Sequence, residues 1–140
     1  MCYTEKVPVD KLRQAYNCML DRVNATDMYS TVVTAYTASL LHNQPDKVYR
    51  GREGKVAELV DSLAERANSS DTGDRFWDNE RKISRWGWSY TNSEAVEMTA
   101  YMVMTEVLRG RRDNALLSVK WLARWCVVIL NLARLLKSLI

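Results

Sequence analysis

Apolar residues recur at helical spacing in five stretches of the chain, and the stretches differ in how much of the helix surface is apolar. Residues 9–23 predict an amphipathic helix. Residues 28–41 are apolar around most of the circumference, whereas 55–67 carry a single apolar stripe. The same order returns further on, because 93–108 is apolar on more than one side and 114–125 on one side only. The pattern predicts an all-α fold.

Capping residues mark several of the expected helix ends. The helices at 28–41 and 93–108, which are apolar on more than one side, are called the thickly apolar helices. Asp27 and Ser93 are their predicted N-caps, and Asp113 is the predicted cap of 114–125. Gly110 stands where a glycine commonly ends a helix in a left-handed conformation. The apolar face of 114–125 is expected to consist of Leu116, Val119, Trp121 and Leu122.

Residues 68–92 predict an irregular connection that is long for a compact domain. Burial of several aromatic side chains would offset much of the entropy lost when such a segment is ordered. An exposed aromatic platform for a ligand is the alternative interpretation. The aromatic residues concerned are Phe76, Trp77, Trp86, Trp88 and Tyr90.

The two thickly apolar helices share a tripeptide, Thr-Ala-Tyr, at 34–36 and at 99–101. Together with the repeated helix order, this indicates an array of helical hairpins in which neighbouring units share a core. The thickly apolar helices would be the inner ones and the one-sided helices the outer ones. Solenoids and α/α toroids both satisfy this arrangement.

Two segments resemble the thioester domains of the α-macroglobulin and complement family. The first is Trp-Ser-Tyr-Thr-Asn-Ser-Glu-Ala-Val-Glu-Met-Thr-Ala-Tyr at 88–101, and the second is Asn-Ala-Leu-Leu-Ser-Val-Lys-Trp-Leu-Ala-Arg at 114–124. The helix at 29–41 is similar to the preceding inner helix of that family. The family-motif residues are Tyr36, Trp88, Val96, Glu97, Thr99, Ala100, Tyr101, Trp121 and Leu122.

The resemblance implies a partial α/α toroid of paired inner and outer helices. Residues 1–125 would be the C-terminal portion of a thioester-type domain, and 126–140 a divergent apolar helical tail. The parent protein would be secreted or surface-anchored, and would act as an endopeptidase inhibitor that traps proteases or as a complement-like protein that tags surfaces in innate immunity. Its partners would be the remainder of the parent chain and, through it, proteases or target surfaces.

The chain departs from the family where the chemistry is expected. It has no Gly-Cys-Gly-Glu-Gln thioester motif, and none of Cys2, Cys18 and Cys126 lies in a similar context. His42, the single histidine, follows the helix that the catalytic histidine of some members precedes, and we interpret it as an ordinary loop histidine. We therefore expect no catalytic residues and a scaffold rather than an enzyme.

Charge and cysteine content exclude several classes of site. The net charge is +3, and the one dense basic cluster is Arg109, Arg111 and Arg112, which favours a solvated helix end over a phosphate-binding patch. Nucleic acid is not an expected partner. Three cysteines without a CxxC pair indicate neither a zinc site nor a disulfide framework, so no metal or cofactor is expected. Cys18 and Cys126 are expected to be small buried side chains.

Features related to secretion are sparse. The first ten residues lack the apolar core of a signal peptide, and no run of about twenty apolar residues predicts a transmembrane segment. Two glycosylation sequons begin at Asn24 and Asn68, in segments between helices. They agree with an extracellular location for the parent.

Two other functions are alternatives to this interpretation. An enzyme with the toroid architecture of terpene cyclases needs an acidic cluster, whereas Asp71, Asp74 and Asp78 stand apart in a loop region. Glu94 and Glu97 are expected to stabilise the N-terminus of their helix through its dipole. The other alternative is a free-standing helical-repeat binding module with no relation to thioester chemistry.

Overall fold

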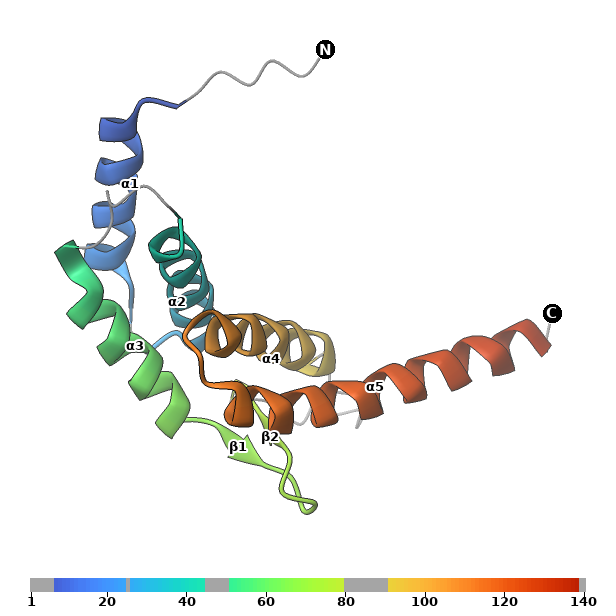
Figure 1. Ribbon diagram of the computed structural model, residues 1–140. Coiled ribbons are helices and arrows are strands. Elements are labelled where there is room, and N and C mark those ends of the chain that lie inside the picture. Colours follow the sequence, from blue (N-terminus) through green and yellow to red (C-terminus); the bar gives the residue numbers. More distant parts are fainter. Residues whose placement is uncertain (1–6, 25, 45–50, 80–90, 139–140) are drawn as a thin grey trace, which may run out of the picture.

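The computed structural model confirms that the chain is all-α apart from one short hairpin (Figure 1). It describes residues 7–24, 26–44, 51–79 and 91–138, and of 91–92 and 126–138 it describes the backbone alone. The elements within these ranges are α1 (Val9–Arg22), α2 (Met28–His42), α3 (Glu53–Glu65), β1 (Asn68–Ser69), β2 (Arg75–Phe76), α4 (Thr91–Leu108) and α5 (Arg112–Ser138).

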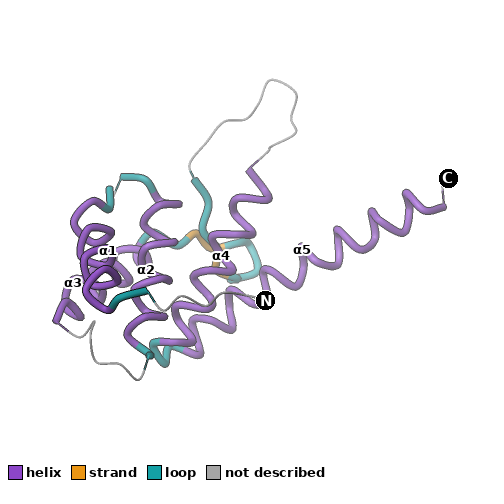
Figure 2. Tube along the Cα trace, turned by 90° about the horizontal axis from the view of Figure 1, so that it is seen from above, coloured by secondary structure: helices purple, strands orange, loops and turns teal. Residues whose placement is uncertain are grey.

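The predicted alternation of inner and outer helices agrees with the packing. Helices α2 and α4 lie side by side, α3 and α1 pack against α2, and α5 packs against α4. Figures 1 and 2 show these helices in a curved arrangement, with α1 near one end and α5 at the other. The two thickly apolar helices are central because each must cover apolar surface on more than one side. Closure of such an arc into a full toroid stays a prediction.

The core lies between the two central helices and α3. Small residues on α2, including Ala35 and Ala38, allow its neighbours to approach closely, and the larger side chains of α3 and α4 fill the space. Burying each of these larger side chains is worth roughly 1.5–3 kcal/mol. The core residues are Tyr16, Leu20, Met28, Val32, Ala35, Ala38, Val56, Val60, Leu63, Trp77, Met98 and Met102.

The segment after α3 is more regular than the sequence predicts. Strands β1 and β2 pair antiparallel, with Asn68 opposite Phe76, and Gly73 takes a positive φ of 79° in the turn. Trp77 is fully buried, and the ring of Phe76 stacks on Trp121 at 4.9 Å between centroids. The expected burial of aromatics is therefore confirmed for Trp77, while Phe76 is partly buried. Trp86, Trp88 and Tyr90 lie outside the described residues.

Several predicted helix ends are shifted or wrong. Ser93 is not an N-cap, because α4 already begins at Thr91, and Asp113 lies inside the first turn of α5. Asp27 does precede α2, but its side chain makes no capping hydrogen bond. Its carbonyl oxygen instead accepts a bond from the Thr31 hydroxyl at 2.7 Å. Gly110 has a φ of 76°, as expected for a glycine that follows a helix.

The predicted apolar face of α5 is partly wrong. Ala115, Ser118 and Trp121 are buried, whereas Leu116 and Val119 are 55% and 43% exposed. The buried residues are spaced three apart, and the two small ones let α5 lie close to α4. Leu116 and Val119 are displaced sideways from that line, so their apolar surface remains uncovered.

Helix α5 continues through residue 126, so the predicted helical tail at 126–140 begins without a break in the helix; its divergence from the family stays a prediction. The helix runs without interruption to Ser138, and its last turns extend away from the other elements in both views (Figures 1 and 2). Among the helices described, none is both long and apolar enough to cross a membrane.

Candidate functional site

The two shared tripeptides meet at the contact between the central helices. The rings of Tyr36 on α2 and Tyr101 on α4 lie 5.2 Å apart between centroids, at 40° to each other. Both side chains are partly buried, while Ala35 and Thr99 are fully buried beside them. The pattern that suggested a repeat therefore marks a real helix–helix interface.

Other family-motif residues join α4 to its neighbours. Thr99 Oγ1 accepts a hydrogen bond from the main-chain N–H of Trp77 at 3.1 Å. Glu97 Oε1 accepts from the Tyr29 hydroxyl at 2.7 Å, and this bond, aided by partial burial, raises the pKa of Tyr29. Glu97 thus links α4 to α2, a role that its place in the first turns did not suggest.

The remaining family-motif residues have packing positions. Trp121 is buried, stacks on Phe76 and lies 5.6 Å from the ring of Trp125. Val96, Ala100 and Leu122 are partly buried, and Trp88 lies outside the described residues.

An ion pair that the sequence pattern does not predict lies beneath the hairpin. Glu106 is fully buried on α4, and its Oε1 accepts from Arg75 Nη1 at 2.5 Å. Arg75 also donates to the carbonyl of Ala64 at 3.1 Å and lies 4.8 Å from the centre of the Trp77 ring. Burial raises the pKa of Glu106, and Arg75 opposes that effect only in part. No spacing rule pairs two residues so far apart in the sequence.

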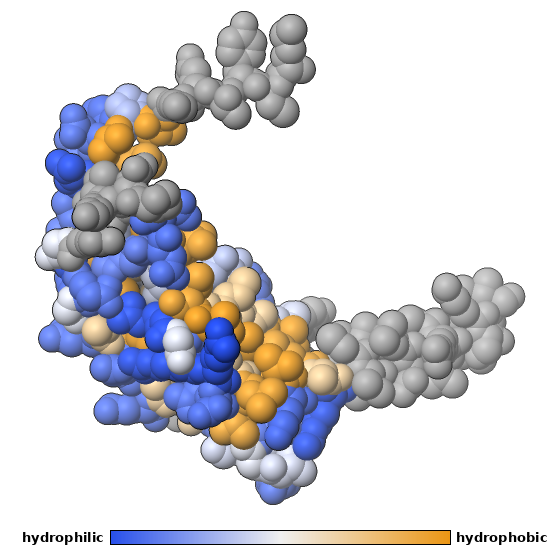
Figure 3. Space-filling view, in the orientation of Figure 1, coloured by the Kyte–Doolittle hydropathy of each residue, from blue (hydrophilic) through white to orange (hydrophobic). Residues whose placement is uncertain are grey.

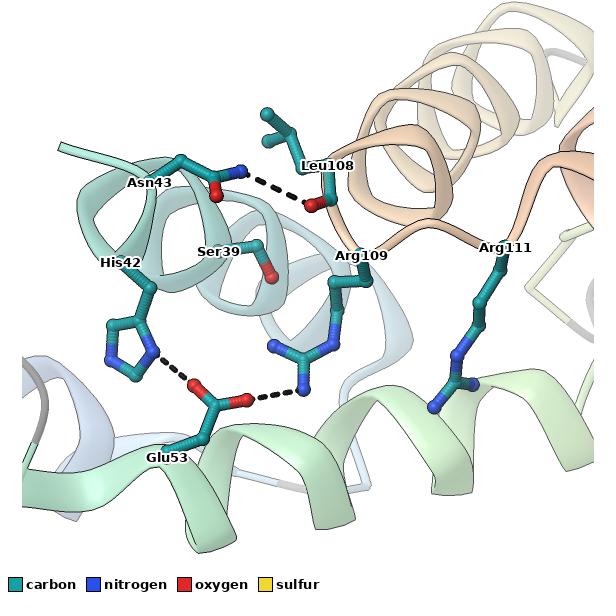
Figure 4. Close-up of a pocket in the computed structure, with 7 residues that line it drawn as sticks. All are labelled: Ser39, His42, Asn43, Glu53, Leu108, Arg109 and Arg111. Atoms are coloured by element: carbon teal, nitrogen blue, oxygen red, sulfur yellow. Dashed lines mark hydrogen bonds and ion pairs between the residues drawn. The ribbon is translucent and has the colours of Figure 1, made fainter.

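A hollow of about 540 Å³ lies where three helix ends meet. The C-terminal ends of α2 and α4 form two of its sides, and the N-terminus of α3 closes a third (Figure 4). Its lining residues are Ser39, His42, Asn43, Glu53, Leu108, Arg109 and Arg111.

His42 is not the loop histidine that the sequence suggested. It is the last residue of α2, and its side chain is only 11% exposed. Nε2 lies 2.6 Å from the Tyr16 hydroxyl, and Nδ1 is bonded to Glu53 Oε2. In the neutral ring, Nδ1–H therefore donates to Glu53 while Nε2 accepts from Tyr16. Burial, and after it the charge of Glu53, raises the pKa of Tyr16.

The same chain of contacts continues from Glu53 to the segment after α4. Glu53 Oε1 accepts from Arg109 Nη2 at 2.5 Å. Burial alone would raise the pKa of Glu53, but the bonds from Arg109 and His42 lower it below its ordinary value. Tyr16, His42, Glu53 and Arg109 thus form a clamp that joins α1, α2, α3 and the end of α4.

The basic cluster after α4 is largely engaged with α3. Arg111 Nη2 donates to Asp61 Oδ1 at 2.5 Å, as Arg109 does to Glu53, while Arg112 is exposed. Asn43 Nδ2 also donates to the carbonyl of Leu108 at 3.1 Å, so the ends of α2 and α4 are tied together. The expected solvated helix end therefore holds for Arg112 alone, because Arg109 and Arg111 are partly buried and paired with carboxylates of α3.

A second opening is an apolar groove of about 270 Å³ between the central helices. Figure 3 shows apolar surface gathered over α4 and the first turns of α5. Within the groove Leu40, Met104 and Val107 are 38%, 39% and 53% exposed. We call this the central groove, and its lining residues are Tyr36, Leu40, Val103, Met104, Val107 and Leu108.

The acidic and thiol groups of the described residues do not form a reactive cluster. In the part of the chain that the structure describes, no group of three His, Cys, Asp or Glu side chains is arranged to hold a metal ion. Asp74 pairs with Arg124 at 3.0 Å, whereas Asp71 is exposed. The prediction that Cys18 is buried is wrong, because it lies on the exposed side of α1. Nothing is described of the side chains of Cys2 and Cys126.

Comparison with known proteins identifies the family. The model of the α-macroglobulin TED domain, the thioester-containing domain, matches residues 2–125. Neither curated proteins nor solved structures gave a match to the chain. The family match covers most of the chain and includes both central helices and the clamp residues. This chain belongs to the α-macroglobulin/complement thioester-domain family.

Proposed function

We propose that the chain is a scaffold and interaction surface of an extracellular α-macroglobulin- or complement-like protein, and not an enzyme. The parent would trap proteases or tag surfaces in innate immunity by means of a thioester formed elsewhere in its sequence. The proposal is supported by the family match over 2–125 and by the absence of a Gly-Cys-Gly-Glu-Gln motif from the 140 residues.

The central groove is the observation that carries the proposal. It exposes apolar side chains of both inner helices, and exposed apolar patches of this kind usually mark a surface that another segment covers. In a toroid, the inner helices of the remaining units face the same axis. The remainder of the parent domain is therefore the partner that we assign to this groove.

Binding of that partner can be tested with the N-terminal part of a thioester domain from a family member. We expect it to co-purify with the chain, and we expect Val107→Asp, in the central groove, to abolish the association. Leu116→Asp is the matched control, because Leu116 is equally exposed but lies on α5 outside the groove. Failure to associate, or equal loss with both variants, would contradict the proposal.

The absence of thioester chemistry is tested separately. The chain is incubated with radiolabelled methylamine, which opens internal thioesters, beside an intact macroglobulin as positive control. We expect no covalent incorporation into the chain, and incorporation of one molecule per chain would show that it forms its own thioester.

A further inference from the structure

In the part of the chain that the structure describes, the residues lining the hollow at the ends of α2 and α4 include several hydrogen-bond donors without partners, and both oxygens of the Glu53 carboxylate are engaged. From this we propose that the hollow binds a small ligand through an anionic group: a carboxylate, sulfate or phosphate. The proposal is independent of the partner assigned to the central groove, because the hollow is at the helix ends.

The free donors come from two sides of the hollow, the segment after α4 and helix α2. Arg109 and Arg111 each use only Nη2 in the bonds described above, and a guanidinium has five N–H donors. Ser39 is 2% exposed, and its Oγ has no partner in the part of the chain that the structure describes. Figure 4 shows the two arginines extending in the same direction from the segment after α4, with Ser39 on the α2 side of Arg109. A buried hydroxyl without a partner is costly, so a ligand that accepts its hydrogen bond is favoured.

The hydrogen-bonding groups that line the hollow also favour a ligand that accepts hydrogen bonds. Among the described residues that line the hollow, Glu53 is the one carboxylate, and both of its oxygens already accept bonds, from His42 and from Arg109. Arg109 pairs with Glu53 and Arg111 pairs with Asp61, so the formal charges at the hollow balance. The guanidinium N–H groups that these pairs do not use remain strongly polarised donors. Because the carbonyl ends of α2 and α4 also carry partial negative charge, an anionic group would be held by directed hydrogen bonds from the arginines and Ser39 and not by a net positive field.

Size and geometry restrict the ligand further. A hollow of about 540 Å³ has room for more than a bare oxyanion, so the anionic group would be part of a larger molecule such as an acidic peptide side chain or a sulfated sugar. The planar guanidinium fork binds carboxylate and phosphate oxygens in pairs, which makes the two arginines suitable anchors.

Binding is measured on the whole 140-residue chain by calorimetry and thermal denaturation. Sulfate, phosphate and acetate are compared with chloride at equal ionic strength, which separates the two kinds of anionic group from general screening. We expect at least one oxyanion to bind saturably and to raise the melting temperature, while chloride does not. Arg111→Gln and Ser39→Ala should each weaken binding, by about tenfold for the arginine. Arg112→Gln is the matched control, since this exposed neighbour does not line the hollow.

A second measurement keeps the proposal testable if Arg111→Gln unfolds the chain. In the unchanged protein, titration with the same oxyanion should shift the Nε–H nuclear resonances of Arg109 and Arg111 more than that of Arg112. The proposal is overturned if no oxyanion binds saturably, if chloride has the same effect, or if Arg112→Gln weakens binding as much as Arg111→Gln.

Discussion

The main-chain N–H of Trp77 donates to Thr99 Oγ1 over 3.1 Å inside the core. Both residues are fully buried, so water has no access to replace the threonine hydroxyl. The indole of Trp77 also donates to the carbonyl of Leu63 at 2.7 Å. The residue that follows β2 is thus bonded to both α3 and α4, which fixes the hairpin on the helices.

Replacement of Thr99 by valine should destabilise the fold, because it keeps the side-chain volume but leaves the Trp77 N–H without a partner. We expect a loss of about 1–3 kcal/mol in the free energy of unfolding, measured by urea denaturation. Thr105→Val is the matched control. Thr105 is equally buried on α4, but its hydroxyl donates to the carbonyl of Tyr101 at 2.8 Å, one turn back in the same helix. Because such a bond adds little to the helix, an equal loss in both variants would contradict this prediction.

Glu106 should make stability fall as the pH rises. Burial raises its pKa above the ordinary 4.5, so the folded chain holds this proton more tightly than the unfolded chain. The stabilisation from the proton is complete below the unfolded pKa and is lost as the pH rises through the folded pKa. We expect the stability of the unchanged chain relative to Glu106→Gln to fall across that range, measured by urea denaturation at a series of pH values. A constant or rising difference would count against a buried carboxyl with a raised pKa.

Glu53 should make the stability of the fold increase as the pH rises, which is opposite to the effect of Glu106. Burial alone would raise its pKa, but the bonds from Arg109 and His42 hold it below the ordinary 4.5. Its stabilisation is therefore present above the unfolded pKa and is lost as the pH falls through the folded pKa. Glu53→Gln should be less stable than the unchanged chain at neutral pH, by less than about 1 kcal/mol because water screens this half-exposed side chain, and the difference should vanish in acid. A difference that is the same at pH 3 and pH 7 would exclude the clamp as its cause.

The central groove should make the isolated chain associate with itself. Val107 is 53% exposed and, with Leu40 and Met104, presents apolar surface that favours contact with a second copy. Sedimentation velocity should show oligomers of the unchanged chain, and Val107→Lys should lower the fraction of the chain that is oligomeric. Ser62→Lys, which adds the same charge at an exposed polar position on α3, is the control. A compact, stable monomer of the unchanged chain would contradict the prediction.

Both sequons should accept glycans if the chain is exported. Asn24 and Asn68 are exposed, and the Thr26 hydroxyl already donates to Asn24 Oδ1 at 2.7 Å. The chain, fused to a signal peptide and secreted from cultured cells, should lose mass on treatment with an amidase that removes N-glycans. Asn24→Gln and Asn68→Gln should each remove one glycan. Secretion without any glycan would rule out both sites.

The helix order and the alternation of thick and one-sided apolar helices could be predicted from the sequence. Periodicity records how many sides of a helix are covered, and it identified α2 and α4 as the central pair. The shared Thr-Ala-Tyr predicted that Tyr36 and Tyr101 belong to equivalent helices, and their rings are in contact. The apolar periodicity is visible in the sequence because it depends on residues a few positions apart, and the shared tripeptide is visible because it is a repeat of identical residues.

The tertiary structure decided what depends on pairs of residues distant in the sequence. Nothing local distinguishes His42 as a clamp residue instead of a loop residue, or pairs Arg75 with Glu106, because partners more than 10 positions apart meet only when helices pack. The buried face of α5 also depends on tertiary packing. Ala115 and Ser118 are buried because small side chains let α5 lie close to α4, and not because they are strongly apolar. Sequence periodicity thus determined which helices form and which are central, while the geometry of their packing determined which side chains touch.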